Sequence, residues 1–81
     1  MARFTVLWFA QLRAQTGVAQ ETCGGKAETP ETLYAALAGR HGLAPRKQLA
    51  LAVAVNEDWA DWAQPLADGD TVAFLPPVAG G

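Results

Sequence analysis

Phe4-Thr-Val-Leu-Trp-Phe9 is a run of β-branched and aromatic residues near the start of the chain, a composition typical of a β-strand. A second run of this kind, Thr71-Val-Ala-Phe-Leu75, lies near the other end. A helix predicted between them permits a right-handed crossover, so we expect the two strands to lie side by side and parallel. The fold therefore depends on pairing between two segments that are distant in sequence.

One main helix is predicted between these strands. Thr29-Pro-Glu-Thr32 is a helix start, because the first threonine can cap free amides, the proline needs no N–H there, and the glutamate complements the positive helix end. Gly39 or Gly42 is expected to end the helix.

The remaining strands are weaker in pattern. Val18 to Cys23 is expected to form a second strand, joined to the first by a long connection from Ala10 to Gly17, and Gly24-Gly25-Lys26 is expected to be a turn that ends it. Leu49 to Asn56 alternates large residues with alanines, which predicts a strand with one bulky face and one shallow face.

The predicted fold class is α+β, with a mixed sheet covered on one face by one main helix, the β-grasp or ubiquitin-like architecture. Trp59 to Leu66 is expected to be irregular with at most a short strand, and Asp68-Gly-Asp70 to form the turn before the last strand. We expect residues 1–75 to form the domain and residues 76–81 to form an extended tail.

A single helix covers only one face of the sheet, so the strand residues divide into two sets. The expected core set contains alternate residues of the first and last strands: Phe4, Val6, Trp8, Val72 and Phe74. The opposite set would lie on the uncovered face: Leu7, Phe9, Ala73 and Leu75. Because burying a Phe or Leu side chain is worth about 1.5–3 kcal/mol, a partner protein is expected on that face. The alternative is that the two sets are reversed and these residues form the core.

The composition is that of a small globular domain, since 51% of the 81 residues are hydrophobic and 17% are charged. The net charge is −2 and the six basic residues are scattered, so we expect no nucleic-acid partner. Acidic residues gather in the C-terminal half, either as a solvated rim of turns or as a docking patch. We expect no membrane partner and a cytoplasmic location, since no targeting segment or apolar span is visible and one cysteine cannot form an internal disulfide.

No catalytic constellation or metal site is predicted. His41 is expected to cap the helix C-terminus, and Cys23 to be a half-buried small hydrophobic residue. Trp59 and Trp62 are expected to pack beneath the irregular segment rather than to stack on bases.

The last six residues have an unusual composition: Pro76, Pro77, Val78, Ala79, Gly80 and Gly81. Prolines favour an extended backbone, so this tail spans at most roughly 20 Å and can enter a narrow channel. The terminal carboxylate of Gly81, with a pKa near ~3.3–3.7, resists nucleophiles as an anion. Adenylation would activate it, after which sulfide would give a thiocarboxylate and an amine would give an amide.

Three blocks closely resemble the MoaD family, the small subunits of molybdopterin synthase: the ending Asp68 to Gly81, the segment Val6 to Arg13 followed by Thr16-Gly17, and Ala54-Val-Asn56. The resemblance implies a sulfur carrier for molybdenum cofactor biosynthesis, whose Gly81 is adenylated by a MoeB-type enzyme using ATP, then thiocarboxylated. The sulfur would pass to a pyranopterin precursor.

The resemblance also implies a MoaE-type large subunit that carries the catalytic side chains, in a heterotetramer, so this chain would hold no catalytic residue and bind no cofactor. By resemblance, Phe9 and Leu75 would contact that subunit, and Leu7, which is expected on the same uncovered face, is the third residue of the predicted interface. The alternatives are a ThiS-type carrier for thiazole synthesis, a ubiquitin-like protein modifier, or a purely structural interaction domain.

Overall fold

The computed structural model describes residues 2–25 and 29–77. Five strands form one mixed sheet in the order β2-β1-β5-β3-β4. In chain order the elements are β1 (Ala2–Trp8), α1 (Ala10–Thr16), β2 (Gln20–Gly25), α2 (Pro30–His41), β3 (Ala52–Val55), β4 (Asp58–Trp59) and β5 (Thr71–Leu75).

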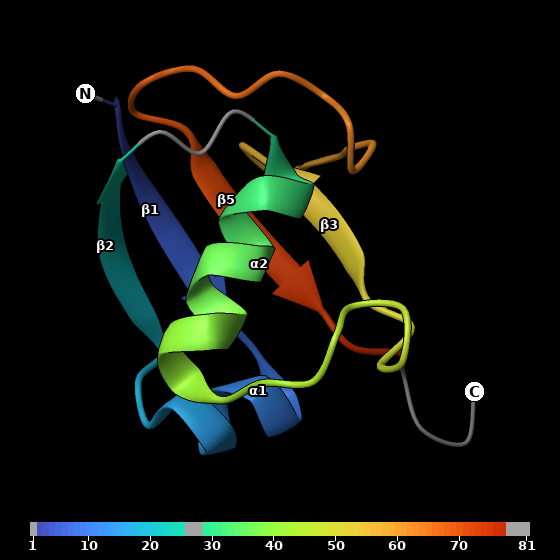
Figure 1. Ribbon diagram of the computed structural model, residues 1–81. Helices are drawn as coiled ribbons and strands as arrows, with labels where there is room; N and C mark the ends of the chain where they lie inside the picture. Colours follow the sequence, from blue (N-terminus) through green and yellow to red (C-terminus); the bar gives the residue numbers. More distant parts are fainter. Residues whose placement is uncertain (1, 26–28, 78–81) are drawn as a thin grey trace.

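The central pair of strands is β1 and β5, which are parallel as predicted, while the other pairs are antiparallel. Helix α2 crosses one face of the sheet, α1 lies at one end of it, and the chain from β4 to β5 arches over the opposite end (Figure 1). The predicted α+β class and β-grasp architecture are confirmed.

Helix α2 begins and ends at the predicted signals. The Thr32 amide donates to Thr29 Oγ1 at 3.2 Å and the Thr29 amide donates to Thr32 Oγ1 at 3.1 Å, which forms a reciprocal capping box. At the other end Gly42 takes a left-handed conformation with φ 70°, and its amide donates to the Ala38 carbonyl. Gly42 rather than Gly39 therefore ends the helix.

The predicted core set is confirmed, since its five members, Phe4, Val6, Trp8, Val72 and Phe74, are all at most 1% exposed. Phe74 lies at the centre of an aromatic cluster. The rings of Trp8, Tyr34 and Trp62 lie 5.5, 5.2 and 5.8 Å from it, centroid to centroid. Aromatic rings bury large areas of apolar surface, so this cluster packs the helix and the irregular segment against the sheet and stabilises the contact.

Two predicted connections differ from the structure. The expected long connection from Ala10 to Gly17 contains α1. Only Leu12 of its seven residues is buried, so the segment has no repeating pattern of large apolar residues that would predict a helix. Strand β2 begins at Gln20 and continues through Gly24 and Gly25, which pair with Arg3 and Ala2 instead of forming a turn.

The strand predicted from Leu49 to Asn56 is also shorter, because residues 46–50 form turns closed by backbone hydrogen bonds such as Leu51 to Arg46. Its alternation is confirmed within β3. Val53 and Val55 face the core, opposite Phe74 and Val72, which leaves alanines on the other face.

A two-residue turn, Asn56-Glu57, connects β3 to β4, and both residues have positive φ, 52° and 72°. Such hairpin turns favour Asn-Gly, because glycine adopts this conformation without a Cβ penalty. We expect Glu57→Gly to raise the free energy of unfolding by roughly 0.5–1 kcal/mol and the Tm by about 4 °C, measured by calorimetry. The matched control is Asp58→Gly in the adjoining strand, which should lower the Tm; a lower Tm for Glu57→Gly would contradict the strain argument.

Candidate functional site

One row of side chains crosses the uncovered face of the sheet from β1 to β4. Leu7 pairs with Ala73, Ala73 with Ala54, and Ala54 with Trp59. Partners in register point to the same face, so these four side chains lie in line. The two inner members are alanines and the two outer members are large.

The difference in size produces a hollow of about 320 Å³. Its floor is formed by Ala54 and Ala73, with larger apolar residues around them. The complete lining is Leu7, Phe9, Ala54, Glu57, Trp59, Thr71, Ala73 and Leu75. The apolar centre with a polar rim at Glu57 and Thr71 resembles the organisation of protein–protein interfaces.

The structure brings together the three residues expected at a partner interface, Leu7, Phe9 and Leu75. Phe9 is 43% exposed, while Leu7 and Leu75 are half-buried. The prediction that this set lies on the uncovered face is confirmed, and the reversed arrangement is wrong, because the alternate residues fill the core.

The tail leaves the domain at the edge of this face. Leu75 is the last residue of β5 and is followed by Pro76, which is half-buried, and Pro77, which is exposed. The other tail residues, Val78, Ala79, Gly80 and Gly81, lie outside the described residues. A protein seated on the uncovered face is thus next to the point where the tail begins.

Trp59 is the residue of this face that sequence reasoning missed. Trp62 packs inward as predicted and stacks on Phe74, but Trp59 is 75% exposed, so the prediction that both indoles pack beneath the irregular segment is wrong for Trp59. The cause is the hairpin turn, which pairs Trp59 with Ala54 and aims it at the uncovered face. An Asn followed by two acidic residues after a strand was the available signal for such a hairpin.

The polar cluster around Glu21 has a structural role. Glu21 Oε2 accepts a hydrogen bond from Trp8 Nε1 at 2.6 Å and lies 2.8 Å from His41 Nε2, while Arg40 lies 3.6 Å from Oε1. The imidazole thus joins the helix end to β2 instead of capping the helix. Cys23 is 7% exposed, more buried than the half-buried residue expected.

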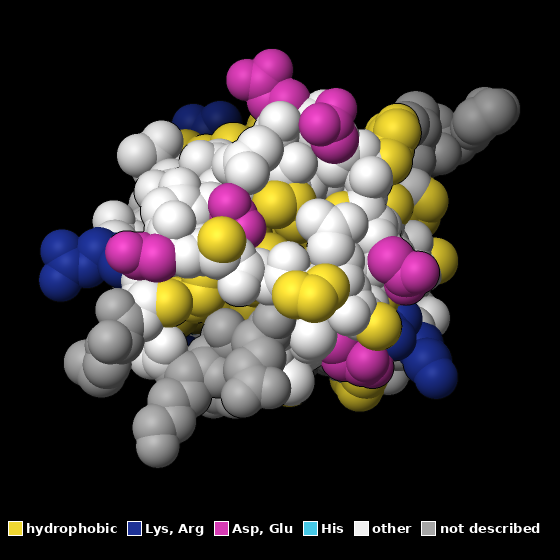
Figure 2. Space-filling model, turned by 90° about the horizontal axis from the view of Figure 1, so that it is seen from above, with side chains coloured by type: hydrophobic (Ala, Val, Ile, Leu, Met, Phe, Trp, Pro, Cys, Tyr) yellow, Lys and Arg dark blue, Asp and Glu magenta, His cyan; other side chains and the backbone are white. Residues whose placement is uncertain are grey.

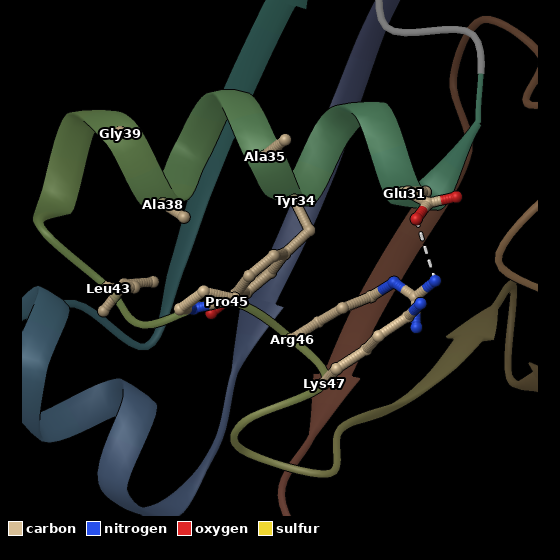
Figure 3. Close-up of a pocket in the computed structure, with 9 residues that line it drawn as sticks. All are labelled: Glu31, Tyr34, Ala35, Ala38, Gly39, Leu43, Pro45, Arg46 and Lys47. Carbon is tan, nitrogen blue, oxygen red and sulfur yellow. Dashed lines mark hydrogen bonds and ion pairs between the residues drawn. The ribbon is translucent and has the colours of Figure 1, made fainter.

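A second, larger hollow of about 420 Å³ lies between α2 and the following loop, on the helix side (Figure 3). Arg46 spans one end, pairing with Glu31 at 2.8 Å and lying 4.4 Å above the Trp62 ring. The Tyr34 hydroxyl donates to the Ala44 carbonyl at 2.6 Å, and burial raises the pKa of Tyr34. Its lining includes none of the residues predicted for the site, so the uncovered face is the better candidate.

Charge is spread over the surface. From the end that is uppermost in Figure 1, acidic side chains are scattered singly and basic ones lie at the margins (Figure 2). Asp68 and Asp70 accept hydrogen bonds from the backbone N–H groups of Arg3 and Ala67, respectively, both at 2.8 Å, which agrees with the interpretation of the acidic residues as a solvated rim of turns.

Within residues 2–25 and 29–77, no group of three or more metal-binding side chains could hold an ion, and no helix is long and apolar enough to cross a membrane.

Comparison with known proteins relates this chain to sulfur carriers. The model of the ThiS family matches residues 6–81. The molybdopterin synthase sulfur carrier subunit of Escherichia coli (strain K12) is 42% identical over 79 residues, covering 94% of this chain and 96% of that protein.

Several solved structures are similar over nearly the whole chain. One is the complex of subunits 1 and 2 of molybdopterin-converting factor from Helicobacter pylori 26695, with 31% identity, a TM-score of 0.65, and coverage of 98% of this chain and 99% of that chain. Another is small archaeal modifier protein 1 of Haloferax volcanii, with 23% identity, a TM-score of 0.79, and coverage of 96% of this chain and 100% of that chain. The second likeness concerns the fold alone.

Proposed function

This chain belongs to the ThiS family, and on that basis we propose that it is the sulfur carrier subunit of a molybdopterin synthase. The observation that carries the proposal is the 42% identity over 79 residues with the carrier of Escherichia coli. An apolar face that adjoins the start of a Pro-Pro…Gly-Gly tail supports it, because a carrier must dock and then extend its end into another active site.

In this proposal the reacting group is the carboxylate of Gly81. An adenylating enzyme of the MoeB type joins a carboxylate oxygen to the α-phosphate of ATP, and pyrophosphate leaves. Sulfide then attacks the acyl carbon and AMP leaves with the carboxylate oxygen, which yields the thiocarboxylate with no change of oxidation state. Glycine suits this position, since it places no side chain beside the attacked carbon. The carrier binds no cofactor of its own, and ATP is used by the activating enzyme.

The uncovered face docks the MoaE-type large subunit in the same proposal. The related Helicobacter pylori protein is described as a complex of subunits 1 and 2. Leu7, Phe9 and Leu75 would be buried by that contact, each contributing up to about 1.5–3 kcal/mol before ordering costs. The pyranopterin precursor and the catalytic side chains belong to the large subunit, which receives the sulfur from Gly81.

The test is the intact mass of the chain purified from cells that also express its adenylating enzyme. We expect an increase that corresponds to one sulfur replacing one oxygen, located at Gly81 by tandem mass spectrometry. Omission of the adenylating enzyme is the control and should give the unmodified mass. Isopeptide conjugates to lysines without any thiocarboxylate would instead support a protein modifier and reject the carrier.

A further inference from the structure

We propose that the hollow between α2 and the loop that follows it binds a small carboxylate with an apolar body, such as a medium-chain fatty acid. Its apolar walls include Tyr34, Ala38 and Leu43, and Arg46 and Lys47 lie at one end (Figure 3). We name it the helix-side hollow. It lies on the α2 side of the sheet, so the inference does not rest on the proposed function or on the docking face.

The helix-side hollow is held open by hydrogen bonds between its two walls. The Leu43 amide donates to the Ala38 carbonyl at 2.9 Å, and the Tyr34 hydroxyl donates to the Ala44 carbonyl at 2.6 Å. These bonds fix the loop against the helix, so the volume of about 420 Å³ needs no rearrangement to form. Sites for small molecules are usually preformed and mostly apolar, with volumes of roughly 300–1,000 Å³. The hollow has the size and the lining of such a site.

Gly39 lines the hollow, although the helix does not require a glycine there. Its φ is not positive, and a Cβ built on it would meet no atom of another part of the chain within 4 Å. Glycine within a helix loses more conformational entropy than alanine on folding, and so it destabilises the helix. A larger side chain at this position would occupy space in the hollow. Gly39 therefore costs helix stability but leaves the hollow open.

The end of the hollow at Arg46 and Lys47 carries net positive charge, although the net charge of the whole chain is −2. Glu31 offsets only part of this charge. It pairs with Arg46 at 2.8 Å, but its side chain is 55% exposed, so water screens the pair. Lys47 is exposed and has no ion-pair partner in the part of the chain that the structure describes. A carboxylate at this end would thus be attracted, while its apolar body would lie against the apolar walls.

The surroundings of the hollow favour a small molecule over a protein as its occupant. Three large apolar side chains are exposed among the described residues, Phe9, Val18 and Trp59, and none of them lines this hollow. A specific protein interface covers about 800 Å² on each partner and has an apolar centre. Because the large apolar side chains here are confined to the hollow itself, we expect a ligand that the hollow can contain.

Octanoate is the probe that combines the apolar body with the carboxylate. Octanol has the same chain without the charge, and octylammonium has the opposite charge, so both are matched controls. In an NMR titration of the isotope-labelled full chain, we expect octanoate to bind with a Kd of about 1 mM or lower and about fivefold more tightly than either control. The amide signals that shift should be those of Ala38, Gly39 and Leu43.

The first variant fills the hollow. Gly39→Leu is expected to lower the affinity for octanoate at least about tenfold while the Tm rises by about 2–4 °C, because leucine favours the helix more than glycine does. Gly39→Ala is the matched control, since it improves the helix but adds only a methyl group. It should show a similar rise in Tm and bind octanoate as the wild type does.

The second variant removes the unpaired charge. Lys47→Gln is expected to lower the affinity for octanoate about threefold and to leave the affinity for octanol unchanged. Lys47 is substituted rather than Arg46, because Arg46 lies 4.4 Å above the Trp62 ring and has a structural role. Arg13→Gln, an exposed basic residue on α1 outside the hollow, is the matched control and should bind both probes as the wild type does.

The proposal has several ways to fail. Equal affinities for octanoate and octanol would overturn the choice of a carboxylate, and wild-type binding by Gly39→Leu would overturn the site. Shifts confined to Leu7 and Ala73 would place the probe on the uncovered face, which also overturns the site. If the wild-type chain self-associates in light scattering and Gly39→Leu alone abolishes this, the occupant is a second copy and the proposal is overturned. The thiocarboxylate test of the proposed function is independent of all these results, so the two proposals can fail separately.

Discussion

Deletion of Gly81, or addition of residues after it, is expected to lower sulfur transfer in a reconstituted synthase by at least about 10²-fold, because the reacting carbon is then missing or displaced from the active site. The Tm should not change, since the core residues and β5 all precede the tail. The assay combines the chain, its adenylating enzyme, a sulfur donor, the large subunit and the precursor, and measures the dithiolene product.

The control for this prediction moves the same extension to the other end of the chain. Residues added before Met1 should leave the rate of sulfur transfer unchanged, which separates an effect on Gly81 from a general effect of length. Wild-type transfer by the chain lacking Gly81 would contradict the proposal that this residue carries the sulfur.

Phe9→Lys and Leu75→Lys are expected to weaken binding to the large subunit by about 10²-fold or more. Each would place a charged ammonium group in an apolar contact, and burying an unpaired charge is costly. The free chain should lose little stability, because Phe9 is already 43% exposed and a lysine can extend its ammonium group into water. Titration calorimetry measures the binding, and thermal unfolding of the free chain measures the stability.

Val18→Lys is the matched control, because Val18 is also apolar and 40% exposed but does not line the hollow on the uncovered face. It should bind like the wild type. If Phe9→Lys and Leu75→Lys instead unfold the chain while Val18→Lys does not, their side chains are part of the core and the assignment of the docking face is wrong.

Local signals in the sequence were sufficient for the parts of the fold that rest on strong periodicity or capping. The alternation in β1 and β5 predicted which side chains fill the core, because strand geometry leaves only two faces. Thr29 and Pro30 located the start of α2, since the chemistry of a helix N-terminus involves neighbours in sequence.

Elements whose form depends on distant neighbours were predicted less well. Helix α1 has a single buried residue, Leu12, so its sequence contains no repeating apolar pattern from which a helix could be predicted. Gly24 and Gly25 read as a turn, but pairing with β1 keeps them extended. Trp59 and Trp62 are equally apolar and three residues apart, yet one lies in the aromatic cluster and the other on the surface.

The sequence by itself determined the fold class and the core face of the central strands, because these depend on local periodicity, while the carrier function was predicted from the resemblance of the chain to the MoaD family. Only the tertiary structure decided that Leu7, Ala73, Ala54 and Trp59 form one row. The register between strands that are distant in sequence sets this row, and no local pattern encodes that register. Because these four strands pair in this register, two alanines and an exposed indole line one hollow next to the residue where the tail begins.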